Sequence, residues 1–124
     1  MHVPFRIALL LLVALGLASC GRWHHDDDDD IVVESQELAS LGNGCIVRGT
    51  VRNDGDHAVR VFFAWRAYDR DDDRIGTADA EVPDVPRRGG TRDFESTRFR
   101  EFDGDLISCG RIARIKRSTV VTRD

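Results

Sequence analysis

The chain has 124 residues, of which 32% are charged and 41% are apolar, and its formal net charge is −4. This length suffices for one domain of about 100 residues and excludes two independent hydrophobic cores. Five of the acids form the run Asp26–Asp30, so the part of the chain that follows this run is close to neutral.

The first twenty residues have the composition of a targeting signal. Arg6 provides a positive start, Ile7–Leu17 is an unbroken apolar stretch, and small residues precede Cys20. At a rise of about 1.5 Å per residue, this stretch is too short to span a hydrocarbon core about 30 Å thick. We therefore predict that residues 1–19 are a signal peptide that is removed on export.

The residues Leu17-Ala18-Ser19-Cys20 resemble the bacterial lipobox in all four positions. The resemblance implies that the Cys20 thiol receives a diacylglycerol, that the chain is cut before it, and that the new amine is often acylated too. Two or three acyl chains anchor a protein durably, at about 0.8 kcal/mol per buried methylene. Gly21 stands where an aspartate tends to cause inner-membrane retention, which favours the outer membrane in an organism with two membranes. The alternative is a plain signal peptide with a chance cysteine.

The segment 20–30 carries the acidic run and is predicted to be a tether. Its like charges repel one another and keep the chain extended, which lifts the following domain off the membrane. The alternative is metal capture by His24, His25 and the neighbouring carboxylates.

Residues 31–124 are predicted to form one all-β domain. It opens with the β-branched residues Ile31–Val33. The segment Gly44–Asn53 then alternates between two faces, one of which carries Arg48, Thr50 and Arg52. A tight turn is expected at residues 53–56, because Asn, Asp and Gly tolerate the left-handed conformation. The second face of the 44–53 strand consists of Cys45, Val47, Gly49 and Val51.

Ala58–Tyr68 is the longest and most aromatic of the predicted strands, and Trp65 is expected to be buried in the core. The inward face is predicted to contain Val59, Val61, Phe63, Trp65 and Ala67. The opposite face offers a possible interaction surface made of Arg60, Phe62, Arg66 and Tyr68.

The rest of the chain contains shorter strands and loops, and no helix longer than a turn or two is predicted after the signal. Turn signals at roughly ten-residue spacing indicate an antiparallel β-sandwich. The predicted segments are a polar loop at Asp69–Arg74, a strand at Ile75–Val82, a proline-containing connection at Pro83–Gly90, a strand at Thr91–Ser96, a weakly signalled strand at Thr97–Phe102, and a β-rich segment at Leu106–Val121 with a bulge or a break near Gly110.

Two cysteines remain after Cys20. In an exported protein an even pair most simply forms a disulfide, here Cys45–Cys109, joining the first strong strand to the last. A redox-active pair is the alternative, but neither cysteine lies in a Cys-x-x-Cys arrangement.

The stretch from about Cys45 to Phe94 contains Gly49-Thr50-Val51-Arg52-Asn53, Gly55, Trp65-Arg66-Ala67-Tyr68-Asp69, Gly76, Gly89-Gly90 and Phe94. In these features it resembles the FxLYD domain, an immunoglobulin-like β-sandwich of bacterial and archaeal surface proteins. The resemblance implies an immunoglobulin-like fold but no shared chemistry. Trp65 and Ala67 replace the Phe and Leu that give the family its name.

One loop has the spacing of a metal site. Asp69, Asp71 and Asp73 resemble the first half of a calcium-binding loop. The sixth position of such a loop requires glycine and has Arg74, and the twelfth requires glutamate and has Ala80. A solvated hairpin loop is the alternative, and no metal site is assigned.

An enzyme is not expected. His57 stands alone in a turn, with no nucleophile whose proton it is placed to accept. The basic segment Arg111–Arg117 either docks on an anionic surface, at about 1 kcal/mol per basic residue, or is the charged face of an edge strand.

The sequence therefore favours a lipid-anchored envelope protein whose β-sandwich is a binding or structural module. Its expected partners are the membrane, through the lipid, and an envelope protein or cell-wall polymer. Nucleic acid is excluded by the compartment, and the sequence does not indicate an oligomeric state. The alternative function is an ion or ligand sensor that uses Asp69–Asp73 or the His/Asp tether.

Overall fold

The computed structural model describes residues 30–123, and the signal peptide, Cys20 and the tether up to Asp29 lie outside these described residues. These described residues form six strands and one short 3-10 helix. They are β1 (Ile31–Leu41), β2 (Gly44–Asn53), β3 (Val59–Tyr68), β4 (Arg74–Val85), β5 (Gly90–Glu95), η1 (Cys109–Arg111) and β6 (Arg114–Arg123).

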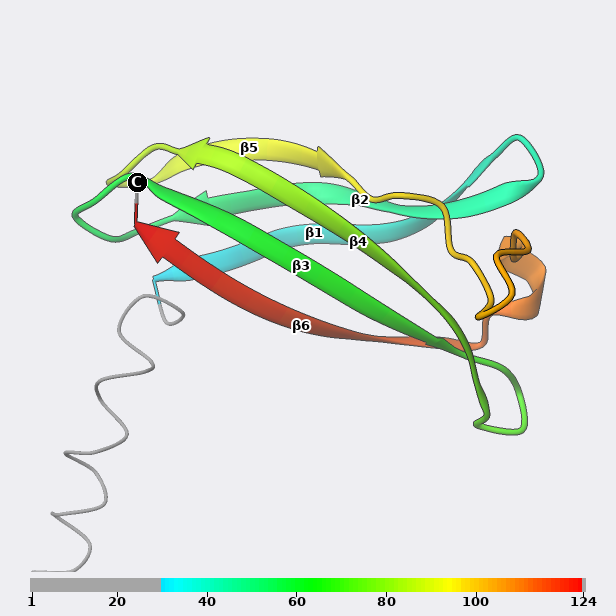
Figure 1. Cartoon of the computed structure of the whole chain (residues 1–124). Coiled ribbons are helices and arrows are strands. Elements are labelled where there is room, and N and C mark those ends of the chain that lie inside the picture. Colours follow the sequence, from blue (N-terminus) through cyan, green and yellow to red (C-terminus); the bar gives the residue numbers. More distant parts are fainter. Residues whose placement is uncertain (1–29, 124) are drawn as a thin grey trace, which may run out of the picture.

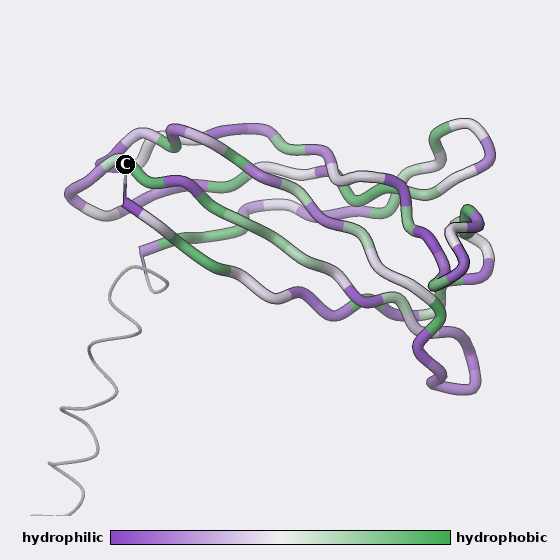
Figure 2. Tube along the Cα trace, in the orientation of Figure 1, coloured by the Kyte–Doolittle hydropathy of each residue, from purple (hydrophilic) through white to green (hydrophobic). Residues whose placement is uncertain are grey.

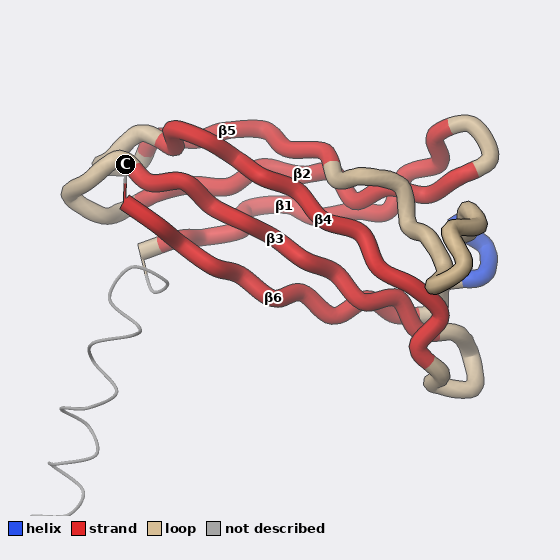
Figure 3. The backbone as a smooth tube through the Cα atoms, in the orientation of Figure 1, coloured by secondary structure: helices blue, strands red, loops and turns tan. Residues whose placement is uncertain are grey.

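The strands make two antiparallel sheets of three strands each, one in the order β1-β2-β5 and the other in the order β4-β3-β6. Figure 3 shows the two sheets as two layers of strands that run lengthwise along the molecule. The expected all-β class and the β-sandwich arrangement are confirmed.

The two ends of the sandwich differ. β1 begins and β6 ends at the same end, which we call the entry end, beside the turn that joins β2 to β3 (Figure 1). The opposite end, here called the far end, carries the β1–β2 turn, the loop 69–73 and η1. The far-end loop between β3 and β4 is hydrophilic throughout (Figure 2).

Alternation along β2 and β3 sets the core. All five side chains expected on the inner face of β3 are buried, and so are Cys45, Val47 and Val51 of β2. Trp65 is fully buried, as predicted, and its ring lies 5.4 Å from that of Phe63 and 5.8 Å from that of Phe94, measured between centroids. Such aromatic contacts contribute about 0.5–1.5 kcal/mol beyond the burial of their area.

The buried indole has a hydrogen-bond partner from the facing sheet. Its Nε1–H donates to Oε1 of Gln36, 3.0 Å away, and the same oxygen accepts a 2.8 Å bond from Arg117 of β6. A buried polar group without a partner would cost about 1–3 kcal/mol. Gln36 therefore satisfies the Trp65 donor and links the edge strands β1 and β6.

β1 extends further than its β-branched start indicates. It pairs with β2 as far as Leu41↔Gly44, with a shift in register between Val33 and Ser35. The backbone of Ser35 lies so close to Gly49 that a Cβ on Gly49 would be 1.9 Å from the Ser35 oxygen. Any larger residue at position 49 would push these two strands apart.

β4 continues beyond its predicted end at Val82 to Val85, so the prediction that the connection begins at Pro83 is wrong, although Pro83 lies in an edge strand and not at a sheet centre. Proline is tolerated because β4 is an edge strand and the pairing slips at this point, from Val61↔Val82 to Val59↔Val85. Asp84 takes a positive φ of 57° in this irregular step.

The weakly signalled strand at Thr97–Phe102 does not form. This segment instead crosses between the sheets, because Ser96 N–H donates to Val47 O of β2 (2.8 Å) and Thr97 N–H donates to Asp79 O of β4 (2.8 Å). Arg100 then forms an isolated bridge with Thr77. The crossing segment covers part of the outer edge of β4.

Near Gly110 the structure has a break rather than a bulge, which decides between the two predicted alternatives. The short helix η1 occupies Cys109–Arg111, and β6 starts only at Arg114. Cys109 therefore precedes the last strand rather than lying in it. The disulfide Cys45–Cys109 is present and joins the start of β2 to η1 at the far end.

The disulfide is expected to stabilise the fold strongly. It links positions 64 residues apart. Closing a loop of that length lowers the entropy of the unfolded chain and so raises its free energy by about 4 kcal/mol. We predict that Cys45→Ala/Cys109→Ala lowers the free energy of unfolding by about this amount, measured by urea unfolding with tryptophan fluorescence. Ser108→Ala, an exposed neighbour, is the control, and an unchanged free energy in the cysteine variant would contradict the prediction.

Candidate functional site

The residues expected to form an interaction surface share one face of the sandwich. Arg60, Phe62, Arg66 and Tyr68 alternate with the buried residues of β3 and therefore lie on the outer side of the sheet β4-β3-β6. We call this surface the outer face. The residues of β6 opposite them are Thr122, Val120, Lys116 and Arg114, in that order.

The half of the outer face toward the entry end is apolar. Phe62 and Val120 are directly opposite one another, and 37% and 58% of their surfaces are exposed. They line a shallow hollow of about 390 Å³ together with Ala64, Asp79, Glu81 and Ser118. Arg60 lies at its border and forms a 3.0 Å ion pair with Glu81.

The half toward the far end is cationic. Arg66 of β3 and Lys116 of β6 are directly opposite one another. In the next row the Arg114 guanidinium lies 4.2 Å from the centroid of the Tyr68 ring and also pairs with Asp72. The hydrogen bond to Asp72 raises the pKa of Arg114 above its ordinary value, so this side chain stays charged.

The structure divides the expected basic strand Arg111–Arg117. Arg111 lies in η1 and pairs with Glu101 at 2.9 Å, whereas Arg114, Lys116 and Arg117 belong to β6. β6 is an edge strand, as required by the interpretation of the basic residues as the charged face of an edge strand. An unbroken basic strand is therefore not present, and only Arg114 and Lys116 contribute to the outer face.

The loop 69–73 brings its three alternate aspartates together. Ligand atoms of Asp69, Asp71 and Asp73 lie within 4.8 Å of one another. Oδ1 of Asp69 already accepts hydrogen bonds from the backbone N–H groups of Asp71 (2.9 Å) and Asp73 (3.0 Å). The cluster is exposed except for the half-buried Asp69, and the Asp69 carboxylate supports the turn itself.

A second acidic cluster, which the sequence did not reveal, lies in the chain segment that precedes η1. Glu101, Asp103 and Asp105 also bring ligand atoms within 4.8 Å of one another. Asp103 Oδ1 accepts a hydrogen bond from the N–H of Asp105, and Glu101 pairs with Arg111. The alternate spacing of the three acids is the signal that would have found it.

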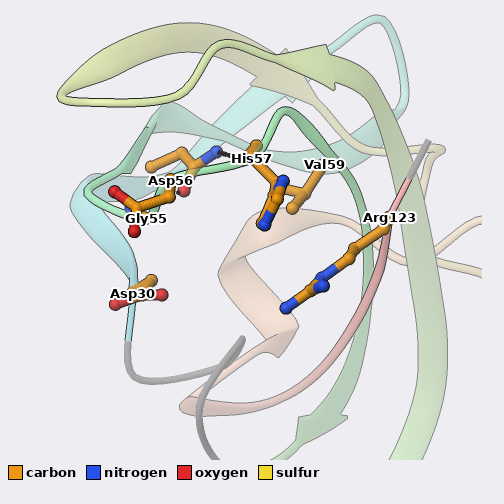
Figure 4. Close-up of a pocket in the computed structure, with 7 residues that line it drawn as sticks. Asp30, Gly55, Asp56, His57, Val59 and Arg123 are labelled. Carbon is orange, nitrogen blue, oxygen red and sulfur yellow. Dashed lines mark hydrogen bonds between the residues drawn. The ribbon is translucent and has the colours of Figure 1, made fainter.

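A small polar pocket lies at the entry end. It has a volume of about 130 Å³, and Figure 4 shows Arg123 reaching into it from the end of β6, opposite Asp30 and His57. The buried Asn53 fixes its wall, because Nδ2 donates to the carbonyl oxygens of His57 (2.7 Å) and Val85 (3.1 Å). The described residues that line the pocket include no hydroxyl or thiol that could act as a nucleophile beside His57.

In the part of the chain from 30 to 123, no helix is long and apolar enough to cross a membrane. Comparisons with protein-family models, with curated proteins and with solved structures found no match to this chain. The candidate sites are therefore interpreted from their own geometry.

The turn at the entry end contains a carboxyl group with a shifted pKa. Arg52 makes a two-pronged contact with Asp54, at 2.8 and 3.1 Å, and lowers the pKa of its carboxyl group. The folded state therefore favours the ionised form. This contribution to stability is present above the pKa of the unfolded chain and disappears as the pH falls through the lower, folded value.

We predict that Asp54 titrates below the range of an ordinary aspartate when followed by carboxyl-carbon NMR. Arg52→Gln should return its pKa toward the ordinary value, because the main cause of the shift is the hydrogen bond from Arg52. Arg92→Gln is the control, since Arg92 donates only to the Thr91 carbonyl oxygen. A pKa of Asp54 that is the same in both variants would refute this assignment.

Proposed function

We propose that this protein is an envelope lipoprotein, anchored by lipid on Cys20, that presents its β-sandwich as a non-catalytic binding module. The observation that carries the binding role is the outer face, where exposed Phe62 and Val120 adjoin the cationic pair Arg66 and Lys116. Soluble domains bury most large apolar side chains, so an exposed apolar pair beside clustered charge is typical of an interaction surface.

The disulfide supports export. Disulfides persist in oxidising compartments and are rare in the cytosol, which agrees with removal of a signal peptide at residues 1–19. The placement of β1 supports the tether, because β1 begins at the entry end (Figure 1) and the acidic run immediately precedes β1 in the sequence. An anchor at Cys20 would therefore attach the sandwich through its entry end and leave the far end directed away from the membrane.

We further propose that the fold is immunoglobulin-like and related to the FxLYD domain. Several residues that carry the resemblance have structural roles in this sandwich. A Cβ on Gly76 would lie 2.3 Å from the Arg100 oxygen, and Phe94 stacks on Trp65. These roles are steric and concern packing, so they support a fold and leave the binding chemistry to the outer face.

For localisation we propose the cell envelope, and the outer membrane if the organism has two, because Gly21 follows the lipidated cysteine. The partners proposed are the membrane through the anchor and an envelope protein or cell-wall polymer through the outer face. No cofactor is proposed apart from the covalent lipid.

The anchor can be tested directly. We predict that labelled palmitate is incorporated into the wild-type protein and that the protein partitions into a detergent phase, whereas Cys20→Ser abolishes both because the thiol that accepts the lipid is gone. Ser19→Ala, which keeps a small residue before the cysteine, is the control. Absence of label from the wild-type protein would exclude the lipoprotein assignment.

The alternative function, calcium sensing by the loop 69–73, is favoured by the proximity of its three carboxylates. We nevertheless expect the melting temperature to be unchanged by millimolar calcium, because Asp69 already accepts two backbone hydrogen bonds and the loop lacks the glycine and glutamate of a complete calcium loop. A rise in melting temperature that is lost in Asp71→Asn and kept in Asp103→Asn would establish the sensor instead.

A further inference from the structure

The outer face contains an unfavourable arrangement of charge that its own sheet does not compensate. Arg66 and Lys116 are direct neighbours across the β3–β6 pairing. Like charges placed directly opposite one another destabilise a sheet. Neither side chain forms an ion pair with a described residue.

The acids that border the outer face already have other partners. Asp72 pairs with Arg114, and Glu81 pairs with Arg60 at 3.0 Å. Asp79 accepts a 3.3 Å hydrogen bond from the Thr97 hydroxyl group. Two positive charges therefore remain side by side on an exposed sheet, which is the electrostatic complement of a negatively charged ligand.

The apolar half of the outer face decides between classes of negatively charged ligand. A phosphate or uronate polymer would satisfy Arg66 and Lys116 but would leave Phe62 and Val120 exposed to water. A protein segment can combine carboxylates with an apolar side chain. Since Phe62 and Val120 lie four residues along their strands from Arg66 and Lys116, the two halves are about 13 Å apart.

The edge of β6 indicates how such a segment lies. The other edge strands are less suited to pairing with an added chain. The edge of β4 is partly covered by the crossing segment at Thr97–Arg100, the pairing of β1 is irregular near Ser35, and β5 has only six residues. β6 is ten residues long and pairs with β3 in continuous register, and no described strand occupies its other edge. Such an edge accepts an extended chain.

We propose that the outer face binds an extended acidic segment of a partner protein, which lies along β6 with its carboxylates at Arg66 and Lys116 and an apolar side chain at Phe62 and Val120. This inference rests on the proposed binding role of the same face and specifies its partner. The acids and the apolar residue of the segment are separated by four positions, because the matching rows on β6 are Lys116 and Val120.

The test uses the full-length protein, purified from membranes in detergent, and a library of random displayed peptides as long as the ten residues of β6. We expect selected peptides to be enriched in Asp and Glu, with an apolar residue four positions away. The variant Arg66→Glu/Lys116→Glu should bind these peptides at least about tenfold more weakly, with a steep loss of wild-type binding as salt is added. Phe62→Ser should weaken binding without changing its dependence on salt.

Matched controls separate this result from unfolding and from general charge effects. Arg87→Glu/Arg92→Glu makes the same change in charge at exposed positions off the outer face and should bind as the wild type does. Near-ultraviolet circular dichroism must show that each variant is folded. Selection of peptides without acidic enrichment, or equal binding by the two double variants, would overturn the proposal.

Other occupants give different outcomes, and each would also overturn it. If poly(glycerol phosphate) binds more tightly than the selected peptides, and Arg66→Glu/Lys116→Glu abolishes this binding, the partner would be a polymer. If the wild type sediments with phosphatidylglycerol vesicles and Arg66→Glu/Lys116→Glu does not, the result would identify a lipid surface. Concentration-dependent dimers that Phe62→Ser disrupts would identify a second copy. The lipid anchor is measured separately by palmitate labelling, so failure here leaves the anchor proposal standing.

Discussion

The structure depends on β3 having neighbours on both edges and a core on one face. β4 and β6 use its backbone groups along nearly the whole strand, and its inward side chains, centred on Trp65, pack against the facing sheet. The outward side chains of β3 are the ones that face away from this core. The composition of the outer face is therefore set by the outward residues of β3 together with the β6 residues opposite them.

Patterns of period two revealed the parts of the fold that alternate strongly, and missed those that depend on tertiary context. The burial of β3, and of β2 from Val47 onward, follows from alternation, whereas Gly44–Val47 is buried on both faces. The cysteine pair followed from the inferred compartment. Much of β1 was missed because Glu34–Glu37 is exposed and polar. Pro83 was misplaced because a sequence does not show which strand lies at an edge, where proline is tolerated.

The candidate site was predicted only in part for a similar reason. Alternation placed Arg60, Phe62, Arg66 and Tyr68 on one face, but the opposing residues of β6 depend on the register between segments about fifty residues apart. Lys116 therefore belonged, in the sequence, to a run of basic residues, and in the structure to a pair with Arg66. The apolar contact between Phe62 and Val120 was hidden in the same way.

The position of the disulfide has a mechanical consequence. A pulling force applied between the start of β1 and the end of β6 follows covalent bonds, and at Cys45 the shortest covalent route passes through the sulfurs to Cys109. The strands between these cysteines, including β3, then carry no tension. Such a load can extend the chain that includes β1 and β6, whereas the chain between the two cysteines cannot be extended until the cross-link is reduced.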